Sequence, residues 1–245
     1  MKHIAALVAD RMKENETADE LRRRAEARLH PRLTDANCLI LRNRREIFAR
    51  WLTRVPGNRL AVLDVGGSLQ PYRPLFESRL ARYVALDLRS NSLIDVRGRA
   101  EQLPLADAIF DVVLCTQVLE YVANPALAVG EIHRVLKRDG VLLLSVPTIF
   151  PRDSEEDCWR FEPAALREIL GAFSRVEVEP EGGSVAGFVR LAAIFLISCT
   201  KLEPVKRLLS YSAVPVLNLF AGWLEGLGLS QNDQFAGNYS AFAQK

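Results

Sequence analysis

Four apolar runs in the middle of the chain form the clearest pattern of hydrophobic positions in the sequence. Each is six residues long and rich in aliphatic side chains, and together they occupy Leu60–Val65, Tyr83–Leu88, Asp111–Thr116 and Val141–Val146. Short apolar runs of this kind are typical of parallel strands that are buried on both faces. The four runs therefore predict the core of a parallel sheet.

A helix is predicted between the last two of these strands. Asn124 is placed to cap it and Pro125 to open it, and the apolar residues that follow share one face. Lys137 and Arg138 are expected in its last turn, with Gly140 as the stop.

The second half of the chain continues the alternation of helices and strands. A helix is predicted from Pro163, followed by a half-exposed strand at 175–179 and a final strand at 241–243. Strands that alternate with helices in this way predict a Rossmann-like, doubly wound α/β sheet.

Two helices are predicted before the first strand. Thr17 and Glu20 have the spacing of a capping box, so a charged helix should follow them. Asp35 is placed to cap a second helix, whose apolar face would pack on the sheet. We therefore divide the chain into an N-terminal basic helical segment, 1–56, and a Rossmann-like domain, 57–245.

Charge is distributed unevenly over a composition that is ordinary for a globular protein. The net charge is +2, but residues 1–60 hold 14 Lys and Arg against 8 Asp and Glu, so this stretch carries +6 and the remainder −4. A solvated helix face explains these arginines at least as well as an anionic partner such as lipid headgroups. Because no RNA-binding module is recognisable, nucleic acid is not expected as a partner.

Cysteine and histidine usage bears on location and on metal binding. The four cysteines lie far apart and the chain has three histidines, so neither a disulfide framework nor a metal site is expected. The apolar run Ile4–Ala9 is too short for the core of a signal peptide. We expect a cytoplasmic protein, with a peripheral position at the inner face of the membrane as an open alternative.

Two strongly apolar stretches, 185–199 and 208–229, predict a helical insert at about 184–235, before the last strand. Neither is a good membrane span, because Arg190 interrupts the first stretch and Pro215 the second. A lid or a homodimer face is the favoured interpretation, and a helix that lies on a membrane surface is the alternative.

The candidate chemistry begins at the carboxyl end of the first strand, where Asp64-Val65-Gly66-Gly67 leads into a loop. Glycines permit a tight turn and let the backbone approach a ligand at this edge of the sheet. Asp87 follows 23 residues after Asp64, at the end of the second strand. An acid at about that spacing hydrogen-bonds the ribose hydroxyls of an adenosine ligand. The loop and the acid together indicate an adenosine-containing cofactor.

Six short motifs follow one another between residues 63 and 137. They read Leu63-Asp64-Val65-Gly66, Leu86-Asp87-Leu88, Ala100-Glu101-Gln102-Leu103-Pro104, Phe110-Asp111-Val112-Val113, Val118-Leu119-Glu120 and Val135-Leu136-Lys137. This series resembles that of the small class I S-adenosylmethionine-dependent methyltransferases of the type 11 group, over about residues 60–180. The resemblance implies a mostly parallel sheet with an antiparallel last strand.

The resemblance also implies a binding site for S-adenosylmethionine. By position, Asp64 and Gly66 would surround the methionine end of the cofactor, with Val65 and Gly67 beside them. Asp87 and Leu88 would contact its ribose, and Ala100 and Glu101 its adenine. Thr116 and Gln117 would line the pocket under its sulfonium. Because a sulfonium methyl is already activated, such a protein has chiefly to align donor and acceptor in a dry pocket.

Three positions depart from the usual pattern of the family. Ser68 stands where a second glycine is usual, and Arg99 where an acid often accepts a hydrogen bond from the adenine amino group. Tyr121 replaces a frequent histidine, and we take it as a candidate for shaping the acceptor site or serving as a weak base. These departures keep a second hypothesis open, a catalytically degenerate methyltransferase fold that acts as a binding or scaffold protein.

A subgroup of the family resembles the chain more closely, through Pro71-Tyr72-Arg73-Pro74-Leu75-Phe76 and Trp159-Arg160-Phe161. Its members often take part in the assembly of cell-surface polysaccharides or glycolipids. Tyr72, Trp159 and Arg160 are therefore candidate acceptor residues, the alternatives being a core position for Trp159 and an ion pair of Arg160 with Asp157 or Glu162.

The leading hypothesis is methyl transfer to an oxygen or nitrogen atom of a small-molecule, glycan-like or lipid-linked acceptor. A nicotinamide-dependent dehydrogenase ranks last. Residues 66–71 lack the third glycine of the dinucleotide fingerprint, and no Tyr-Lys or His-Asp dyad is evident downstream.

Overall fold

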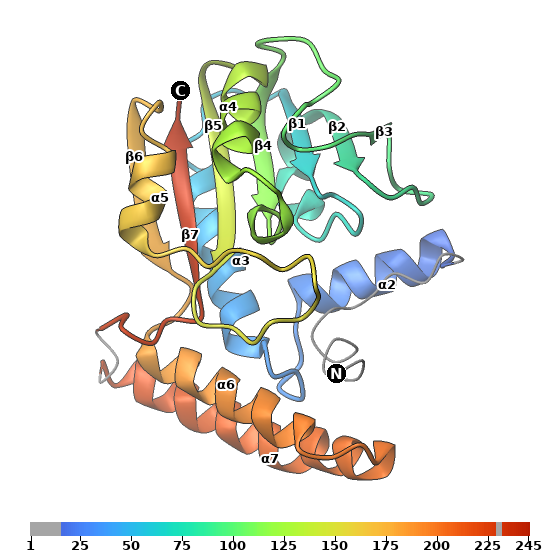
Figure 1. Cartoon of the computed structure of the whole chain (residues 1–245), viewed down its shortest axis with the longest axis vertical. Coiled ribbons are helices and arrows are strands. Elements are labelled where there is room, and N and C mark those ends of the chain that lie inside the picture. Colours follow the sequence, from blue (N-terminus) through green and yellow to red (C-terminus); the bar gives the residue numbers. More distant parts are fainter. Residues whose placement is uncertain (1–15, 229–231) are drawn as a thin grey trace.

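A seven-stranded sheet forms the centre of the chain, for which the computed structural model describes residues 16–228 and 232–245 (Figure 1). The strands are β1 (Leu60–Val65), β2 (Leu80–Asp87), β3 (Val96–Arg97), β4 (Phe110–Thr116), β5 (Leu136–Pro147), β6 (Arg175–Pro180) and β7 (Asn238–Gln244). They lie in the order β3-β2-β1-β4-β5-β7-β6, with β7 antiparallel to both of its neighbours and the other pairs parallel. The predicted Rossmann-like fold is confirmed.

Helices cover both faces of this sheet and one of its edges (Figure 1). They are α2 (Ala18–Leu29), α3 (Cys38–Leu52), α4 (Pro125–Val135), α5 (Pro163–Ile169), α6 (Ser184–Ser198) and α7 (Glu203–Gly226), with short 3-10 helices η1 (Arg73–Arg79) and η2 (Leu119–Tyr121). α4 and α5 pack on one face of the sheet, whereas α3 and η1 pack on the other. α6 and α7 form a hairpin across the carboxyl edge, which is the edge where the parallel strands end and β7 begins.

The first two helices begin differently. Thr17 and Glu20 form the predicted capping box at the start of α2. The prediction that Asp35 caps α3 is wrong, because Asn37 is the N-cap residue and Asp35 Oδ1 instead accepts the Asn37 amide at 2.7 Å. The Asn37 side chain does not cap the helix either, since its oxygen accepts a hydrogen bond from Arg190 Nε of α6 at 2.8 Å.

The helix after β4 ends earlier than the sequence predicts. Asn124 caps it as expected, but α4 ends at Val135 and β5 begins at the next residue, so Lys137 and Arg138 belong to the strand. Strand pairing determines where the helix ends, because Leu136 already pairs with Phe110 of β4. Gly140, predicted to stop the helix, lies inside β5.

The apolar insert forms α6 and α7, which lie between β6 and β7. No helix in the described part of the chain is both long and apolar enough to cross a membrane. The apolar run Ile4–Ala9 lies outside the described residues. The division of the chain at residue 56 stays a prediction.

A ladder of three ion pairs joins α3 and the turn after it to β6 and the residue that follows β6. Its rungs are Arg54–Glu177 at 2.6 Å, Arg50–Glu179 at 2.5 Å and Arg44–Glu181 at 2.8 Å. Three of the arginines that make the N-terminal segment basic are therefore neutralised by acids of the same chain, so they contribute little to the attraction of an anionic partner.

The innermost rung is buried completely. Arg44 is 3% exposed and Glu181 0%, and the guanidinium donates to both carboxylate oxygens. Glu181 also accepts hydrogen bonds from the hydroxyls of Ser145 in β5 and Ser240 in β7. Tyr72, next to η1, accepts a hydrogen bond from Arg44 at 3.4 Å. One buried carboxylate thus fastens α3 and two strands at the carboxyl edge.

The burial of this rung predicts a large effect on stability when one partner is removed. In Arg44→Met the charge of Glu181 loses its partner, and the free energy of unfolding should fall by about 3–5 kcal/mol. Arg50→Met is the matched control on the same helix, because that pair is exposed to solvent and should cost no more than about 1 kcal/mol. Urea unfolding of the two variants measures the difference, and equal losses would contradict this account.

Candidate functional site

The loop after β1 depends on two glycines. Gly66 has φ +76°, and a Cβ atom there would lie 2.3 Å from the Val118 side chain in the segment after β4. A Cβ atom on Gly67 would lie 2.9 Å from the side chain of Asp64. The amides of both glycines donate to the carbonyl oxygen of Leu86, at 2.8 and 3.1 Å. The loop is therefore held against the ends of both β2 and β4.

Ser68 fits this loop without strain. It is half-buried, it does not belong to the residues with a positive φ angle, and its amide donates to the Gly66 carbonyl oxygen at 2.9 Å. A side chain is therefore tolerated where the family usually has a second glycine.

Asp87 ends β2 beside this loop. Its Oδ1 atom accepts the Arg89 amide at 2.9 Å and so stabilises a local turn. Its second carboxylate oxygen has no hydrogen-bond partner within the described ranges. Leu88, the next residue, is 53% exposed. The structure thus leaves one oxygen of Asp87 able to accept a hydrogen bond from a ligand.

The segment after β3 comes next to Asp87 at the same edge. Ala100 is buried, and Glu101 accepts hydrogen bonds from the Ala123 amide at 3.0 Å and from Arg99 at 3.2 Å. Burial raises the pKa of Glu101, but the hydrogen bonds from its own amide and that of Ala123, together with Arg99, outweigh burial, so the pKa lies below its ordinary value. Glu101 thus connects the segment after β3 to the segment after β4, and it forms an ion pair with Arg99.

Asp64 is buried beneath the glycine loop. Its carboxylate is 3% exposed and accepts a hydrogen bond from the Tyr83 hydroxyl at 2.7 Å. Burial raises the pKa of Asp64 to about 7. In this position the Asp64 side chain packs directly against Gly67. Val65, which follows it in β1, is a core residue.

The end of β4 connects the cofactor side of the edge to the buried ion pair. Thr116 is half-buried and pairs with Ser145 of β5. Gln117, with φ +55°, donates its amide to the Ser145 carbonyl oxygen at 2.8 Å and its side-chain Nε2 to the Ser145 hydroxyl at 3.1 Å. That hydroxyl donates to Glu181 at 2.5 Å. Gln117 is therefore fixed by the same network as Arg44.

Glu120 in η2 is a functional candidate that the sequence analysis passed over. It is 2% exposed, and its Oε2 atom is buried without a hydrogen-bond partner among the described residues. Burial raises the pKa of Glu120 to about 8. A carboxyl group with a pKa near the working pH can accept a proton from an acceptor. The sequence offered no sign of this burial, since a helix-start residue is usually exposed.

The environment of Tyr121 opposes the weak-base role that we considered for it. Its hydroxyl donates to Asp153 Oδ2 at 2.6 Å, and burial together with this hydrogen bond raises the pKa of the phenol. A base needs the opposite shift. Tyr121 is 39% exposed and acts as a hydrogen-bond donor that holds the segment after β5.

The three candidate acceptor residues lie in different surroundings. Tyr72 is 2% exposed and packs in the core between α3 and the sheet, and its role at an acceptor site stays a prediction. Trp159 is 41% exposed and donates to the Val122 carbonyl oxygen at 2.9 Å. Arg160 pairs through both nitrogens with Asp157, at 2.5 and 2.7 Å, which decides between the two ion pairs considered.

Arg190 of α6 is a buried cation at the carboxyl edge. It is 5% exposed, donates to the side-chain oxygens of Asn37 at 2.8 Å and Asn238 at 2.5 Å, and lies 4.2 Å from the ring centre of Phe150. No carboxylate of the described residues forms an ion pair with it. Burial lowers the pKa of Arg190 to about 9. The sequence showed this arginine as an interruption of an apolar stretch, without indicating its burial.

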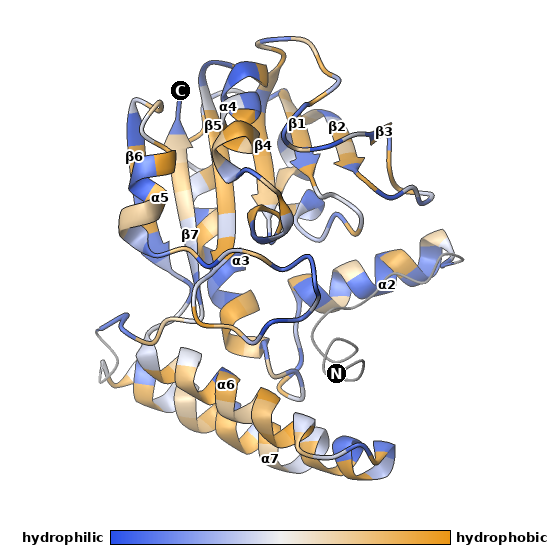
Figure 2. Cartoon of the chain, viewed as in Figure 1, coloured by the Kyte–Doolittle hydropathy of each residue, from blue (hydrophilic) through white to orange (hydrophobic). Residues whose placement is uncertain are grey.

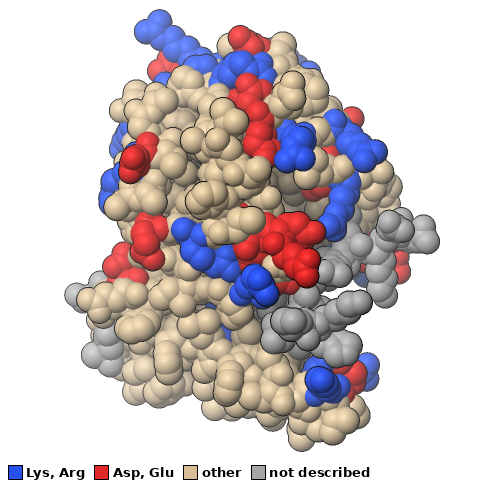
Figure 3. Space-filling view, viewed as in Figure 1, with Lys and Arg blue, Asp and Glu red and all other residues tan. Residues whose placement is uncertain are grey.

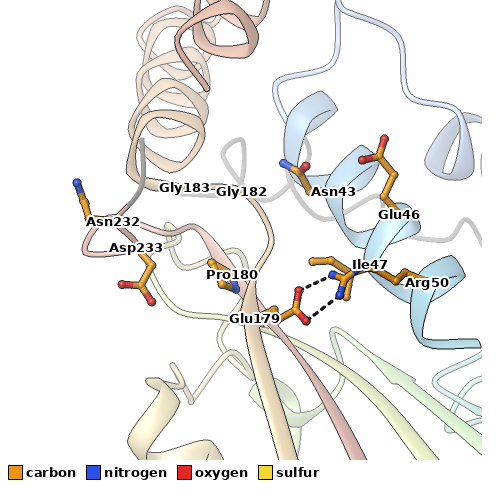
Figure 4. Close-up of a pocket in the computed structure, with 10 residues that line it drawn as sticks. All are labelled: Asn43, Glu46, Ile47, Arg50, Glu179, Pro180, Gly182, Gly183, Asn232 and Asp233. Atoms are coloured by element: carbon orange, nitrogen blue, oxygen red, sulfur yellow. Dashed lines mark hydrogen bonds and ion pairs between the residues drawn. The ribbon is translucent and has the colours of Figure 1, made fainter. Parts of the chain in front are cut away.

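A separate cavity of about 560 Å³ lies on the α3 side of β6 (Figure 4). Its walls include Asn43 and Glu46 of α3, Gly182 and Gly183 after β6, and the Arg50–Glu179 ion pair. Because β6 is separated from β4 by two strands, this cavity is distinct from the predicted cofactor site.

Residues 63–144 match the sequence family described as "Methyltransferase domain". One curated relative, "Probable S-adenosylmethionine-dependent methyltransferase" of Mycolicibacterium smegmatis, is 42% identical over 67 residues, which are 27% of this chain and 23% of the relative. The malonyl-[acyl-carrier protein] O-methyltransferase of Serratia marcescens is 29% identical, over 43% of this chain and 44% of the relative. The matches thus span less than half of these two relatives.

Two solved structures share the architecture. A SAM-dependent methyltransferase of Archaeoglobus fulgidus has a TM-score of 0.50 at 15% identity, with 82% of this chain and 94% of that chain covered. The [4+2]-cyclase SpnF also has a TM-score of 0.50, at 18% identity, with 82% of this chain and 80% of that chain covered. The chain has the fold of the class I methyltransferases. Since one of these neighbours is a cyclase, the likeness alone does not decide the reaction.

The matched domain indicates S-adenosylmethionine as the cofactor, and the carboxyl edge of this class I fold fits that ligand. The Gly66–Gly67 loop, the free oxygen of Asp87 and the segment at Gln117 converge there. Side chains on the two glycines would obstruct this convergence. The adenine contacts expected of Ala100 and Glu101, and the individual roles of the other predicted residues, stay predictions.

The glycine loop predicts a strong dependence on Gly66. Gly66→Ala places a Cβ atom against Val118 at a positive φ angle, so we expect a loss of about 1–3 kcal/mol in the free energy of unfolding. Gly130→Ala in α4 is the control, because nothing lies within 4 Å of its Cβ position, and it should stabilise the protein by up to about 1 kcal/mol. Thermal unfolding compares the two, and a neutral Gly66→Ala would refute the tight packing described.

The raised pKa of Glu120 predicts a pH-dependent stability difference between the protein and Glu120→Gln. Because the folded pKa of about 8 lies above the ordinary value of 4.5, the contribution of the carboxyl group is fully present below pH 4.5. It is lost as the pH rises towards 8, by about 1.4 kcal/mol per unit relative to the variant. Unfolding measured between pH 4.5 and 8 tests this, and a constant difference would show that Glu120 titrates normally.

Proposed function

We propose that the chain is an S-adenosylmethionine-dependent methyltransferase that acts on an oxygen or nitrogen atom of a small-molecule, glycan-like or lipid-linked acceptor. The observation that supports this most is the convergence of the Gly66 loop, Asp87 and Gln117 at one edge of a class I fold. An oxygen acceptor is favoured, because the Serratia relative is an O-methyltransferase.

In this proposal Asp87 holds the ribose of the cofactor, the Gly66 loop borders its methionine end, and Gln117 faces the reacting centre. When bound, the cofactor supplies an activated methyl group. The protein supplies alignment, and the rigid bonding of Gln117 to Ser145 suits that task because a fixed geometry lowers the entropic barrier.

Glu120 is the group that we propose to take the proton of the acceptor. It lies three residues past Gln117, it is buried, and one of its oxygens has no partner in the described structure. Its carbonyl oxygen also accepts the amides of Cys158 and Trp159, at 2.8 and 3.2 Å. Trp159 and Arg160 are thereby held beside Glu120, which supports an acceptor site between η2 and the segment after β5.

An acceptor that carries a phosphate or carboxylate fits the charge at this edge. Arg190 is buried without an ion-pair partner in the described chain, and Asn238 Nδ2 beside it is a buried donor without a hydrogen-bond partner. An anion bound there would give Arg190 an ion-pair partner and Asn238 Nδ2 a hydrogen-bond acceptor. This supports the glycan- or lipid-linked class of acceptors suggested by the Trp159-Arg160-Phe161 motif, since activated glycans are commonly joined to phosphate.

We place the protein in the cytoplasm. All four cysteines are free thiols, two of them exposed, which fits a reducing compartment.

Calorimetric titration with S-adenosylhomocysteine tests the proposal directly. The protein should bind this product with a dissociation constant of about 1–100 μM, and Asp87→Ala should weaken binding at least about tenfold by removing the ribose contact. Asp107→Ala is the matched control, because that acid is exposed and pairs with Arg134 away from the site.

A second variant separates binding from transfer. Glu120→Gln leaves the ribose contact intact, so it should still bind S-adenosylhomocysteine while methyl transfer in an acceptor screen falls by about 10²-fold or more. No binding by a folded wild-type protein would overturn the enzyme proposal in favour of a degenerate scaffold.

A further inference from the structure

The α6–α7 hairpin is apolar on both its buried and its exposed side, whereas an ordinary surface helix is apolar on one side only. Its buried side carries Arg190 and Asn218, which are 5% and 2% exposed. Asn218 Nδ2 donates to the carbonyl oxygens of Leu33 and Asp35, at 2.8 and 2.9 Å. Arg190 donates to Asn37 and Asn238, as described above. These polar contacts fix the orientation of the hairpin on the domain.

Large apolar side chains lie on the opposite side of the hairpin, which we call the outer face. They are more than half exposed and comprise Phe188, Phe195, Leu202, Leu208, Tyr211, Val216, Leu219, Phe220, Trp223 and Leu227. Figure 2 shows the hydrophobic colouring that runs along both helices. Monomeric soluble proteins rarely expose contiguous apolar patches of this kind, which usually mark an interaction site.

Apart from the buried Arg190, the charged residues of the hairpin lie at its ends. None occurs between residues 191 and 200 or between 208 and 224. The tip, where α6 turns into α7, carries Lys201, Lys206 and Arg207 against a single acid, Glu203. In the space-filling view the lower surface is uncharged except for a cluster at this tip (Figure 3). An uncharged outer face thus ends in a cationic tip.

We propose that the outer face of the α6–α7 hairpin docks on the surface of an anionic lipid bilayer. Aromatic and aliphatic side chains would enter the boundary between headgroups and acyl chains, while the tip would meet lipid phosphates. Because the inner side is bonded to the domain, the hairpin would lie on the bilayer without crossing it. The inference goes beyond methyl transfer and does not depend on it.

Charge complementarity favours a bilayer over a second copy of the chain. Lys201 and Arg207 are exposed and form no ion pair among the described residues. The hairpin itself has two acids to offer a second copy, and both are engaged, Glu203 with Lys206 at 2.7 Å and Glu225 with the Gly183 amide at 2.8 Å. A symmetric pairing of outer faces would therefore leave the cationic tips without anionic partners, whereas an anionic membrane supplies them.

The position of the hairpin gives such docking a consequence for the site. α6 lies across the carboxyl edge and contributes Arg190 to it. A bilayer against the outer face would therefore be close to the acceptor side of the protein. A lipid-linked acceptor could reach the site without leaving the membrane surface.

Vesicle flotation of the full chain without cofactor tests the proposal. The protein should float with vesicles of phosphatidylcholine and phosphatidylglycerol and bind vesicles of phosphatidylcholine alone more weakly. Leu219→Ser with Trp223→Ser should reduce binding about tenfold or more, and Lys201→Glu with Arg207→Glu should reduce it selectively for the anionic vesicles. Leu127→Ser, an exposed leucine of α4, is the control and should leave binding unchanged.

Circular dichroism of each variant checks that it is folded. Failure of the folded wild-type protein to float with anionic vesicles would overturn the proposal. So would a dimer in sedimentation that Leu219→Ser with Trp223→Ser converts to a monomer, because a second copy would then cover the outer face. Since cofactor is absent throughout, these outcomes are independent of S-adenosylhomocysteine binding.

Discussion

The buried ion pair of Arg44 and Glu181 is the interaction on which the arrangement of the carboxyl edge depends. A carboxylate that is 0% exposed is tolerated only when its charge and its lone pairs are satisfied, and here a bidentate guanidinium and two hydroxyls satisfy them. The partners come from α3, β5 and β7. α3 is therefore fixed to the sheet, and the Ser145 hydroxyl connects Gln117 to the same hydrogen-bond network.

Buried charge recurs along the same edge. Arg44 is paired with a carboxylate, whereas Arg190 is held by two amide oxygens and the Phe150 ring, and one oxygen of Glu120 has no hydrogen-bond partner among the described residues. Groups of this kind cost stability, and proteins retain them chiefly where a ligand or a reaction makes use of them. The outer face of the hairpin is unfavourable for a similar reason, because it exposes large apolar side chains to water. These two features are the observations on which our proposals of an anionic acceptor inside the site and of lipid outside it rest.

Periodicity predicted the sheet well because it is a local property. The run at 60–65 is β1, and the capping residues Thr17 and Asn124 begin α2 and α4 as expected. The helix predicted to run to Gly140 failed because pairing with β4 overrides local preference. The cap assigned to Asp35 failed because α3 begins only after Asn37, whose side chain is in turn bonded to Arg190, more than 150 residues away in the sequence.

The site was predictable only in part. The positions of the glycine loop and Asp87 follow from chain order, since parallel strands end at one edge. The burial of Tyr72 and Glu120, and the partner of Arg160, depend on how the N-terminal helices and the segment after β5 pack. No spacing rule encodes these contacts, and the environment of Tyr121 likewise comes from Asp153, 32 residues further on.

A crystal structure of the protein with S-adenosylhomocysteine is the most direct test of the central claim. We expect the ribose hydroxyls within hydrogen-bonding distance of Asp87, with the sulfur atom facing Gln117 and Glu120 on the acceptor side. Binding of the nucleoside elsewhere, for example in the cavity beside β6, or a carboxyl edge that stays empty at saturating ligand, would contradict it.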